Sequence, residues 1–214
     1  MDQNLTELVF ILDRSGSMAD LVQDTICGFN SMLARQKKQE GRALVTTVLF
    51  DTEFETLHDR LDIQRVSPMT EREYQPQGCT ALLDAVGDAV RHIMDIHKYA
   101  REEDVPAHTV FVITTDGMEN ASHRYCAEEV KRLIERQRRE QGWEFIFLGA
   151  NIDAVETGAR FGIAPERSVN YRADSRGTKL GYAAVDRAIE IVRSCAPLAD
   201  DWREALDEDY QERG

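Results

Sequence analysis

Residues 8–18 read Leu-Val-Phe-Ile-Leu-Asp-Arg-Ser-Gly-Ser-Met, an apolar run that passes directly into a polar loop. An unbroken apolar run this short is typical of a strand buried on both faces, as in a parallel sheet covered by helices. Gly16 permits a tight turn after the strand. The carboxylate of Asp13 and the hydroxyls of Ser15 and Ser17 can then point the same way, at the end of the strand.

Further strands are predicted on both sides of this one in the sequence. The runs Val110–Ile113 and Phe145–Leu148 have the same unbroken apolar character, and Leu44–Phe50 is rich in Val and Thr. Residues 52–57 follow too short a turn for a crossover, so they are expected to pair back as an antiparallel edge strand. A short strand is expected at 168–171.

Helices are predicted between the strands, because apolar residues recur there at steps of three and four. These stretches are 22–33, 83–97, 127–137 and 182–192, with a shorter helix at 152–160. Strands that alternate with helices indicate a doubly wound α/β fold of Rossmann-like type. The expected architecture is a mostly parallel central sheet with one antiparallel edge strand and helices on both faces.

The chain is expected to form one domain over residues 1–195, followed by an acidic tail over 196–214. Pro197 breaks the last helix, and the tail carries seven acids against two bases. Trp202, Leu206 and Tyr210 recur at a spacing of four, which predicts a small docked helix. Two other interpretations stay open: a solvated end, and a negative arm that reaches a positive partner or a metal site.

Composition and net charge disfavour several classes of binding partner. The net charge of −13 disfavours binding to nucleic acid or to an anionic membrane, since both select basic surfaces. No signal peptide and no apolar segment of about 20 residues is apparent, so no membrane association is expected. The four cysteines have no metal-knuckle or redox spacing, and free thiols without an export signal indicate the cytoplasm.

Two more oxygen-bearing loops accompany the first. Thr80 precedes the helix over 83–97, and Asp116-Gly117 follows the strand that ends at Ile113. Taken singly, these residues are explained by helix capping or by a turn. Together, three loops are expected on the same edge of one sheet, and hard oxygen ligands of this kind suit Mg²⁺ or Mn²⁺.

The order D-x-S-x-S, then T, then D-G resembles the metal-ion-dependent adhesion site of von Willebrand factor A (VWA) domains. The neighbouring stretches Gly78-Cys79-Thr80-Ala81-Leu82 and Ile113-Thr114-Thr115-Asp116-Gly117 extend the likeness over roughly residues 5–195. The chain looks like stand-alone VWA proteins typical of bacteria. The resemblance implies a Mg²⁺ ion, with Mn²⁺ as the alternative, and the ligand set is Asp13, Ser15, Ser17, Thr80 and Asp116.

The resemblance also implies a function, which is gripping another protein through an Asp or Glu that completes the metal's coordination. No enzymatic activity is expected, because Ser15 and Ser17 lack a His partner and no nucleophile elbow or phosphate-binding loop is present. Two alternatives stay open. One is a metal-dependent hydrolase or phosphatase with Glu119 or Asp51 as base, and the other is a metal-free structural domain. Arg14 is expected to point outward.

Overall fold

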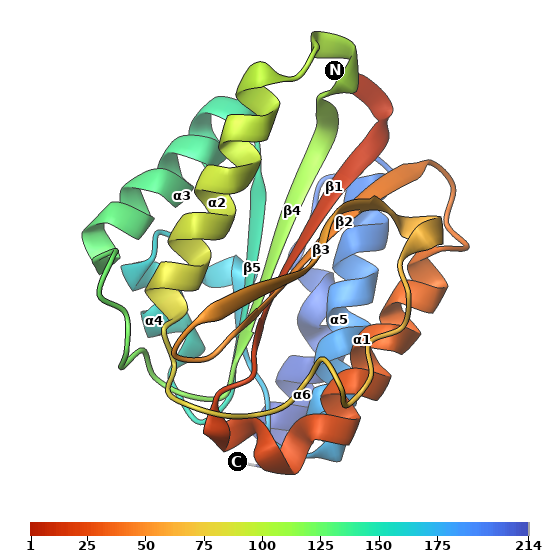
Figure 1. The fold of residues 1–214 in the computed structure, drawn as a ribbon. Helices are drawn as coiled ribbons and strands as arrows, with labels where there is room; N and C mark the ends of the chain where they lie inside the picture. Colours follow the sequence, from red (N-terminus) through yellow and green to blue (C-terminus); the bar gives the residue numbers. More distant parts are fainter. Residues whose placement is uncertain (214) are drawn as a thin grey trace.

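One six-stranded sheet, in the spatial order β3-β2-β1-β4-β5-β6, forms the centre of the computed structural model, which describes residues 1–213 (Figure 1). All neighbouring strands run parallel except β3, which is antiparallel to β2 at one edge. The predicted fold class is therefore confirmed. The strand bounds are β1 (Asp2–Asp13), β2 (Arg42–Phe50), β3 (Phe54–Asp62), β4 (Pro106–Thr115), β5 (Glu144–Gly149) and β6 (Ser168–Asn170).

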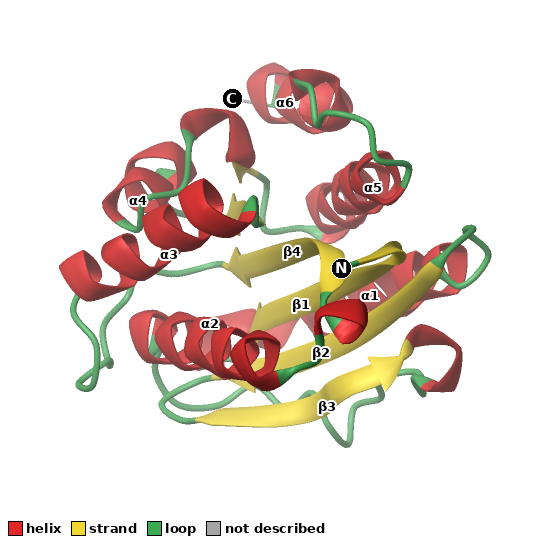
Figure 2. Ribbon diagram, turned by 90° about the horizontal axis from the view of Figure 1, so that it is seen from above, coloured by secondary structure: helices red, strands yellow, loops and turns green. Residues whose placement is uncertain are grey.

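Helices cover both faces of the sheet, as Figure 2 shows from above. One face packs against α1, α5 and α6, and the other packs against α2, α3 and α4. Each predicted helix is present, and its ends lie within about four residues of those expected, except that α5 begins at Ser175, seven residues before the predicted start at 182. The helix bounds are α1 (Val22–Gln36), α2 (Leu82–Tyr99), α3 (Ala127–Gln141), α4 (Ala154–Arg160), α5 (Ser175–Arg193) and α6 (Glu204–Glu212).

Strand β1 explains why the first apolar run is unbroken. Successive side chains of a strand point to opposite faces of its sheet. Leu8, Phe10 and Leu12 accordingly enter the core beneath α1 and α5, whereas Val9 and Ile11 enter the core beneath α2 and α3. Since helices cover both sides of β1 along residues 8–12, each of these five positions is apolar, up to the edge of the sheet at Asp13.

Strand β1 begins earlier than its apolar run, because a buried acid within it is paired. Glu7 has no exposed surface. Its carboxylate accepts a hydrogen bond from Arg60 Nε at 2.9 Å, and His97 Nε2 lies 3.3 Å from the same oxygen. A buried charge is tolerated when partners of this kind surround it. The strand therefore continues back to Asp2, beyond the apolar run that begins at Leu8.

The chain beyond Cys195 forms the small docked helix that its spacing predicted. Trp202 and Leu206 are buried in the core beside α5. The acids of this segment also contribute: Asp201 pairs with Arg187 at 2.7 Å. The buried Asp209 pairs with Arg176 at 2.6 Å. These two carboxylates hold residues 200–212 against α5, so they are not part of a free negative arm. The division into 1–195 and 196–214 stays a prediction.

Candidate metal site

The site lies at the edge of the sheet where β1 and β4 end. Asp13 is the last residue of β1, Asp116 directly follows β4, and the two strands are neighbours. After β1 the chain passes to α1 on one face, and after β4 it passes to α3 on the other. Ligand sites of open α/β sheets form where adjacent connections diverge in this way.

Four of the five predicted residues are linked by contacts between their own groups. Asp13 Oδ1 accepts from the backbone N–H of Ser15 at 2.7 Å. Ser15 Oγ and Ser17 Oγ are 3.2 Å apart, and Ser17 Oγ donates to Asp116 Oδ1 at 2.5 Å. The second Asp13 oxygen accepts from Thr115 Oγ1 at 2.6 Å, a residue that the sequence did not single out.

Thr80 reaches the same space from the start of α2. A methyl group built on Gly117 would lie 3.7 Å from Thr80 Oγ1 and 3.8 Å from Ser17 Oγ, so both hydroxyls face this glycine. Backbone bonds fix the loop that carries Thr80, since Gly16 N–H donates to the Gly78 carbonyl at 3.2 Å. The structure thus brings all five predicted oxygen-bearing residues to one edge of the sheet.

Burial makes the two carboxylates costly to ionise. Asp13 is fully buried and Asp116 is 4% exposed. Burial raises the pKa of Asp13, against the lowering effect of its bonds from Thr115 and Ser15, and the negative charge of Asp116 raises it further. Burial likewise raises the pKa of Asp116, against the bond from Ser17. Two buried acids this close together favour a cation nearby.

The prediction that Arg14 points outward is wrong, because its side chain is buried. Its Nε donates to Asp51 Oδ2 at 2.9 Å, and its Nη1 donates to Glu55 Oε2 at 2.9 Å. The Arg14 carbonyl accepts from Gln77 N–H at 2.9 Å. The guanidinium therefore fastens the first loop to the ends of β2 and β3. Asp51, one of the two bases considered for a hydrolase, is occupied by this ion pair.

Glu119, the other base considered, is also occupied. Its carboxylate accepts from the N–H of Leu83 at 2.8 Å and from the N–H of Ala121 at 2.9 Å. It thus caps the start of α2 and shapes the loop after Asp116, and it is neither a solvated loop charge nor a metal-facing acid. The free N–H groups of a helix start are natural partners for such an acid.

Asp84 is an anchor that sequence reasoning missed. Its two oxygens accept from the backbone N–H groups of His123, Arg124 and Tyr125, at 3.1, 2.9 and 2.9 Å. Burial acts to raise the pKa of Asp84, but these three donors outweigh it and the pKa is lowered. The only sign of this role in the sequence is that Asp84 lies in the first turn of a helix, between apolar residues that are expected to be buried. This bond set ties the 117–126 loop to α2, beside Thr80.

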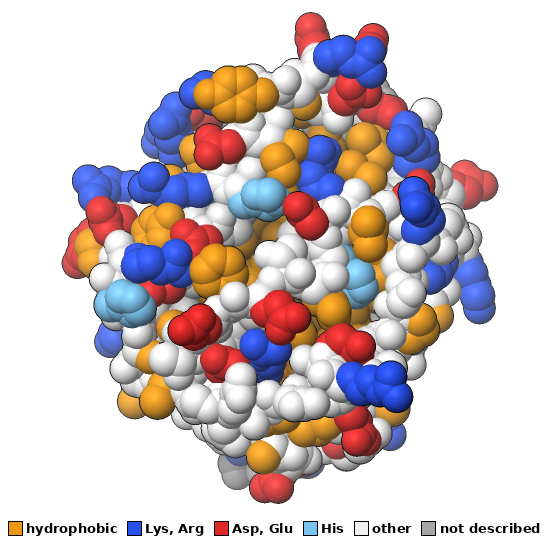
Figure 3. All heavy atoms as spheres, in the orientation of Figure 1, with side chains coloured by type: hydrophobic (Ala, Val, Ile, Leu, Met, Phe, Trp, Pro, Cys, Tyr) orange, Lys and Arg blue, Asp and Glu red, His pale blue; other side chains and the backbone are white. Residues whose placement is uncertain are grey.

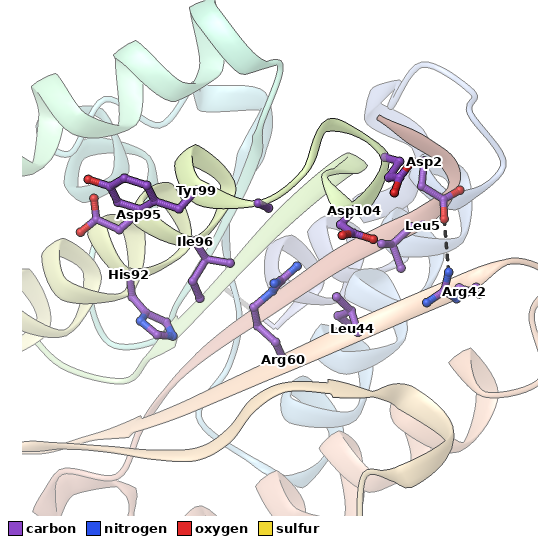
Figure 4. A pocket seen from close by; sticks show the side chains of 12 residues that line it. Asp2, Leu5, Arg42, Leu44, Arg60, His92, Asp95, Ile96, Tyr99 and Asp104 are labelled. Carbon is purple, nitrogen blue, oxygen red and sulfur yellow. Dashed lines mark hydrogen bonds and ion pairs between the residues drawn. The ribbon is translucent and has the colours of Figure 1, made fainter.

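The site depends on hydroxyls. Within residues 1–213, no three His, Cys, Asp or Glu side chains gather as a metal cluster. Figure 3 shows acidic side chains over the whole of this face, mixed with basic ones in its upper and lower halves. A pocket of about 730 Å³ lies at the opposite end of the sheet; its lining includes Arg60, His92 and Asp104, and Asp2 pairs there with Arg42 (Figure 4). Its mixed charges define no ligand.

Comparison with solved structures identifies the fold. Proximal thread matrix protein 1 from the mussel byssus superposes with a TM-score of 0.56 at 15% identity, over 90% of this chain and 47% of that one. The ArnB paralog VWA2 from Sulfolobus acidocaldarius gives 0.53 at 17% identity, over 88% and 45%. The chain has a von Willebrand factor A fold. The manganese-loaded TRAP protein of Plasmodium vivax gives 0.55 at 13% identity, over 84% and 73%.

The chain spans about half the length of the mussel and Sulfolobus chains. No family model and no curated protein matches its sequence. The likeness therefore establishes the VWA fold that the sequence resemblance predicted. None of the helices in residues 1–213 combines the length and apolarity that a membrane span requires.

Proposed function

We propose that the chain binds a divalent cation, Mg²⁺ or Mn²⁺, through Asp13, Ser15, Ser17, Thr80 and Asp116, and uses it to grip a carboxylate of another protein. The observation that carries this proposal is the chain of close oxygens from Ser15 to Ser17 to Asp116, with the Thr80 hydroxyl facing the same glycine. Hard cations of this kind select oxygen ligands. The manganese carried by the Plasmodium VWA structure supports the same ion class.

The donor set fits such an ion and leaves it reactive toward anions. Both Asp13 oxygens already accept protein hydrogen bonds, which suits contact with the metal through water. The three hydroxyl ligands carry no charge. With few carboxylates in direct contact, the cation keeps part of its positive charge and a position for an external ligand. An Asp or Glu side chain of a partner supplies the charge and oxygen that this position favours.

The surroundings favour a partner whose carboxylate is flanked by basic groups. A shallow pocket of about 270 Å³ begins at Ala81, next to Thr80, and is lined by Glu53, Phe54 and Arg124, among others. Arg124 is already paired with Asp88, whereas Glu53 is exposed. With a net charge of −13, the chain attracts basic protein surfaces over short range. The four exposed free thiols support a reducing compartment, the cytoplasm.

A non-enzymatic role is favoured over the hydrolase alternative. A metal-dependent hydrolase needs a base or nucleophile beside the ion. The two bases that the sequence offered are engaged elsewhere, Asp51 by Arg14 and Glu119 by backbone N–H groups. Sustained turnover of a generic phosphoester with Mn²⁺, abolished in Asp116→Ala, would reverse this preference.

Metal binding is tested by titrating Mn²⁺ into the protein and following water-proton relaxation, with Mg²⁺ as competitor. Wild type is expected to bind one ion, and Ser17→Ala is expected to bind it at least several-fold more weakly. Ser31→Ala, an exposed serine on α1, is the matched control and should behave like wild type. A Mn²⁺ titration curve of Ser17→Ala that matches wild type would contradict the proposed metal site. Partner grip is tested separately, by recovering bound proteins with Mg²⁺ and with EDTA.

A further inference from the structure

Residues 66–79, called the strap below, join the short 3₁₀ helix Ile63–Arg65 to α2 and contain no helix or strand. Figure 1 shows the strap passing α1 and the end of β1 on its way to α2. Its first half is fastened to α1. Lys37 Nζ donates to the Val66 carbonyl at 2.7 Å, and the Asn30 amide donates to and accepts from the backbone of Met69 at 2.8 and 2.9 Å. The strap is therefore held in place although it has no regular structure.

The second half of the strap is fastened to the loop at residues 13–17, which carries three of the proposed metal ligands. Two bonds join backbone groups of Gln77 and Gly78 to the backbone of this loop, at 2.9 and 3.2 Å. A third bond comes from a side chain of the strap, because the Tyr74 hydroxyl donates to the backbone carbonyl of Asp13. A carbonyl can only accept, so the phenol must be the donor. The strap thus contacts the metal loop through one side-chain hydroxyl as well as through backbone groups.

The hydroxyl of Tyr74 is not needed to fill space. Tyr74 is 1% exposed and belongs to the same core cluster as Val66 and Met69 of the strap. A phenylalanine would provide the same ring for this packing. Burying a hydroxyl costs free energy unless it is bonded, so its bond to Asp13 is what distinguishes tyrosine from phenylalanine at this position.

The Tyr74 bond acts on the peptide group that joins Asp13 to Arg14. A peptide group is planar, so its carbonyl and its N–H move as one rigid unit. Tyr74 holds the carbonyl, and the N–H of Arg14 donates to the Phe50 carbonyl of β2 at 2.7 Å. With both groups held, the direction in which the chain leaves β1 is set. The next N–H, that of Ser15, then reaches Asp13 Oδ1 at 2.7 Å.

We propose that Tyr74 is a positioning residue of the metal site, whose hydroxyl orients the peptide group after Asp13 and so places the Ser15 and Ser17 hydroxyls for the ion. The consequence for metal affinity rests on the proposed function. Mg²⁺ demands near-octahedral geometry at about 2.0–2.1 Å, and a metal site must hold its ligands to within about 0.5 Å. Tyr74 lies outside the ligand set, and it acts on the ion only through the loop.

The test is Tyr74→Phe, which keeps the ring and removes only the hydroxyl. The Kd for Mn²⁺, measured by water-proton relaxation, is expected to rise about three- to tenfold, as for the loss of one hydrogen bond. In EDTA, hydrogen exchange of the Ser15 N–H is expected to be faster by a similar factor, because its bond depends on the loop geometry. The matched control is Ser168→Ala on β6, which removes a buried hydroxyl that donates to the Ala164 carbonyl at 3.3 Å. It should leave both measurements unchanged.

A merely structural role of Tyr74 predicts a different result. Tyr74→Phe would then lower the Tm but leave the Kd for Mn²⁺ and the exchange of the Ser15 N–H equal to those of wild type, which would overturn the proposal. If the wild-type protein binds no ion, the proposed function fails, and Ser15 exchange in EDTA still decides the role of Tyr74. If Tyr74→Phe does not fold, NMR of the wild-type protein decides. A slowly exchanging Tyr74 hydroxyl proton supports the bond to Asp13, and rapid exchange with water contradicts it.

Discussion

Replacing Asp116 with Asn is expected to affect the stability of the protein differently with and without bound metal. The substitution removes one of two buried carboxylates, yet it keeps an oxygen that can accept the hydrogen bond from Ser17. Without metal, burial disfavours the charge on Asp116, and that charge in turn raises the pKa of Asp13. We therefore expect Asp116→Asn to be at least as stable as wild type in EDTA, and to lose most of its response to Mg²⁺.

The size of this effect follows from the charge that is removed. At ten times its Kd, a metal stabilises the folded state by about 1.4 kcal/mol, or roughly 3–6 °C for a chain of this length. Two unit charges about 4 Å apart interact by about 4 kcal/mol at an effective dielectric constant near 20. If only a third of that attraction is lost, binding weakens about tenfold. The same Mg²⁺ concentration then raises the Tm of the variant by only about 1 °C.

The assay is thermal melting in EDTA and in a Mg²⁺ series, with Asp20→Asn as the control. Asp20 is exposed and lies near the end of the 3₁₀ helix Gly16–Leu21, so its replacement changes the net charge equally without removing a proposed ligand. Asp20→Asn should keep the full Mg²⁺ shift. An equal shift in Asp116→Asn and wild type, or no shift in wild type with any divalent ion, refutes the reasoning.

Three further predictions concern pH and the surrounding structure. Burial raises the pKa of Asp13 above its usual 3.8, so the folded protein without metal binds more protons than the unfolded chain at pH values just above 3.8. Stability to urea in EDTA should therefore fall as the pH rises through this range, and it should fall less in Asp13→Asn. Asp84→Ala strands three backbone N–H groups and should cost about 2–4 kcal/mol in urea denaturation, whereas the exposed Asp95→Ala should be nearly neutral. Leu206→Ala opens the core beside α5 and should cost about 2–4 kcal/mol in the same assay; a loss below about 0.5 kcal/mol would mean that α6 is not part of the folding unit.

The fold was largely predictable because strands that are buried on both faces are continuous apolar runs in the sequence. The part of β1 that helices cover on both faces, residues 8–12, is apolar at every position, and the apolar residues of amphipathic helices recur at steps of three and four. The edge strand β3 was predicted from the short turn before it, yet it extends to Asp62 instead of ending at Leu57. Its last residues are largely polar, and their strand character comes from pairing with β2.

The proximity of the oxygen-bearing residues was predictable from their places at strand ends and at a helix start, and the resemblance named them as one set, whereas their supports were not predictable. Arg14, Glu119 and Asp84 all look like ordinary surface charges in the sequence. Their roles arise from partners 36 to 41 positions away, as the bonds from Arg14 to Glu55 and from Leu83 to Glu119 illustrate. Periodicity reports which face of an element is buried, and it carries no information about which distant backbone groups need an acceptor.

The position of Arg14 bears on how selective recognition can be. Its guanidinium is engaged by Asp51 and Glu55, so it is not free to read the shape of an incoming acid. Under the proposed function, discrimination falls to the ion itself. Exchanging magnesium for a larger or softer ion would then retune the choice of ligand without any change in the polypeptide, and cellular metal supply would become a determinant of affinity.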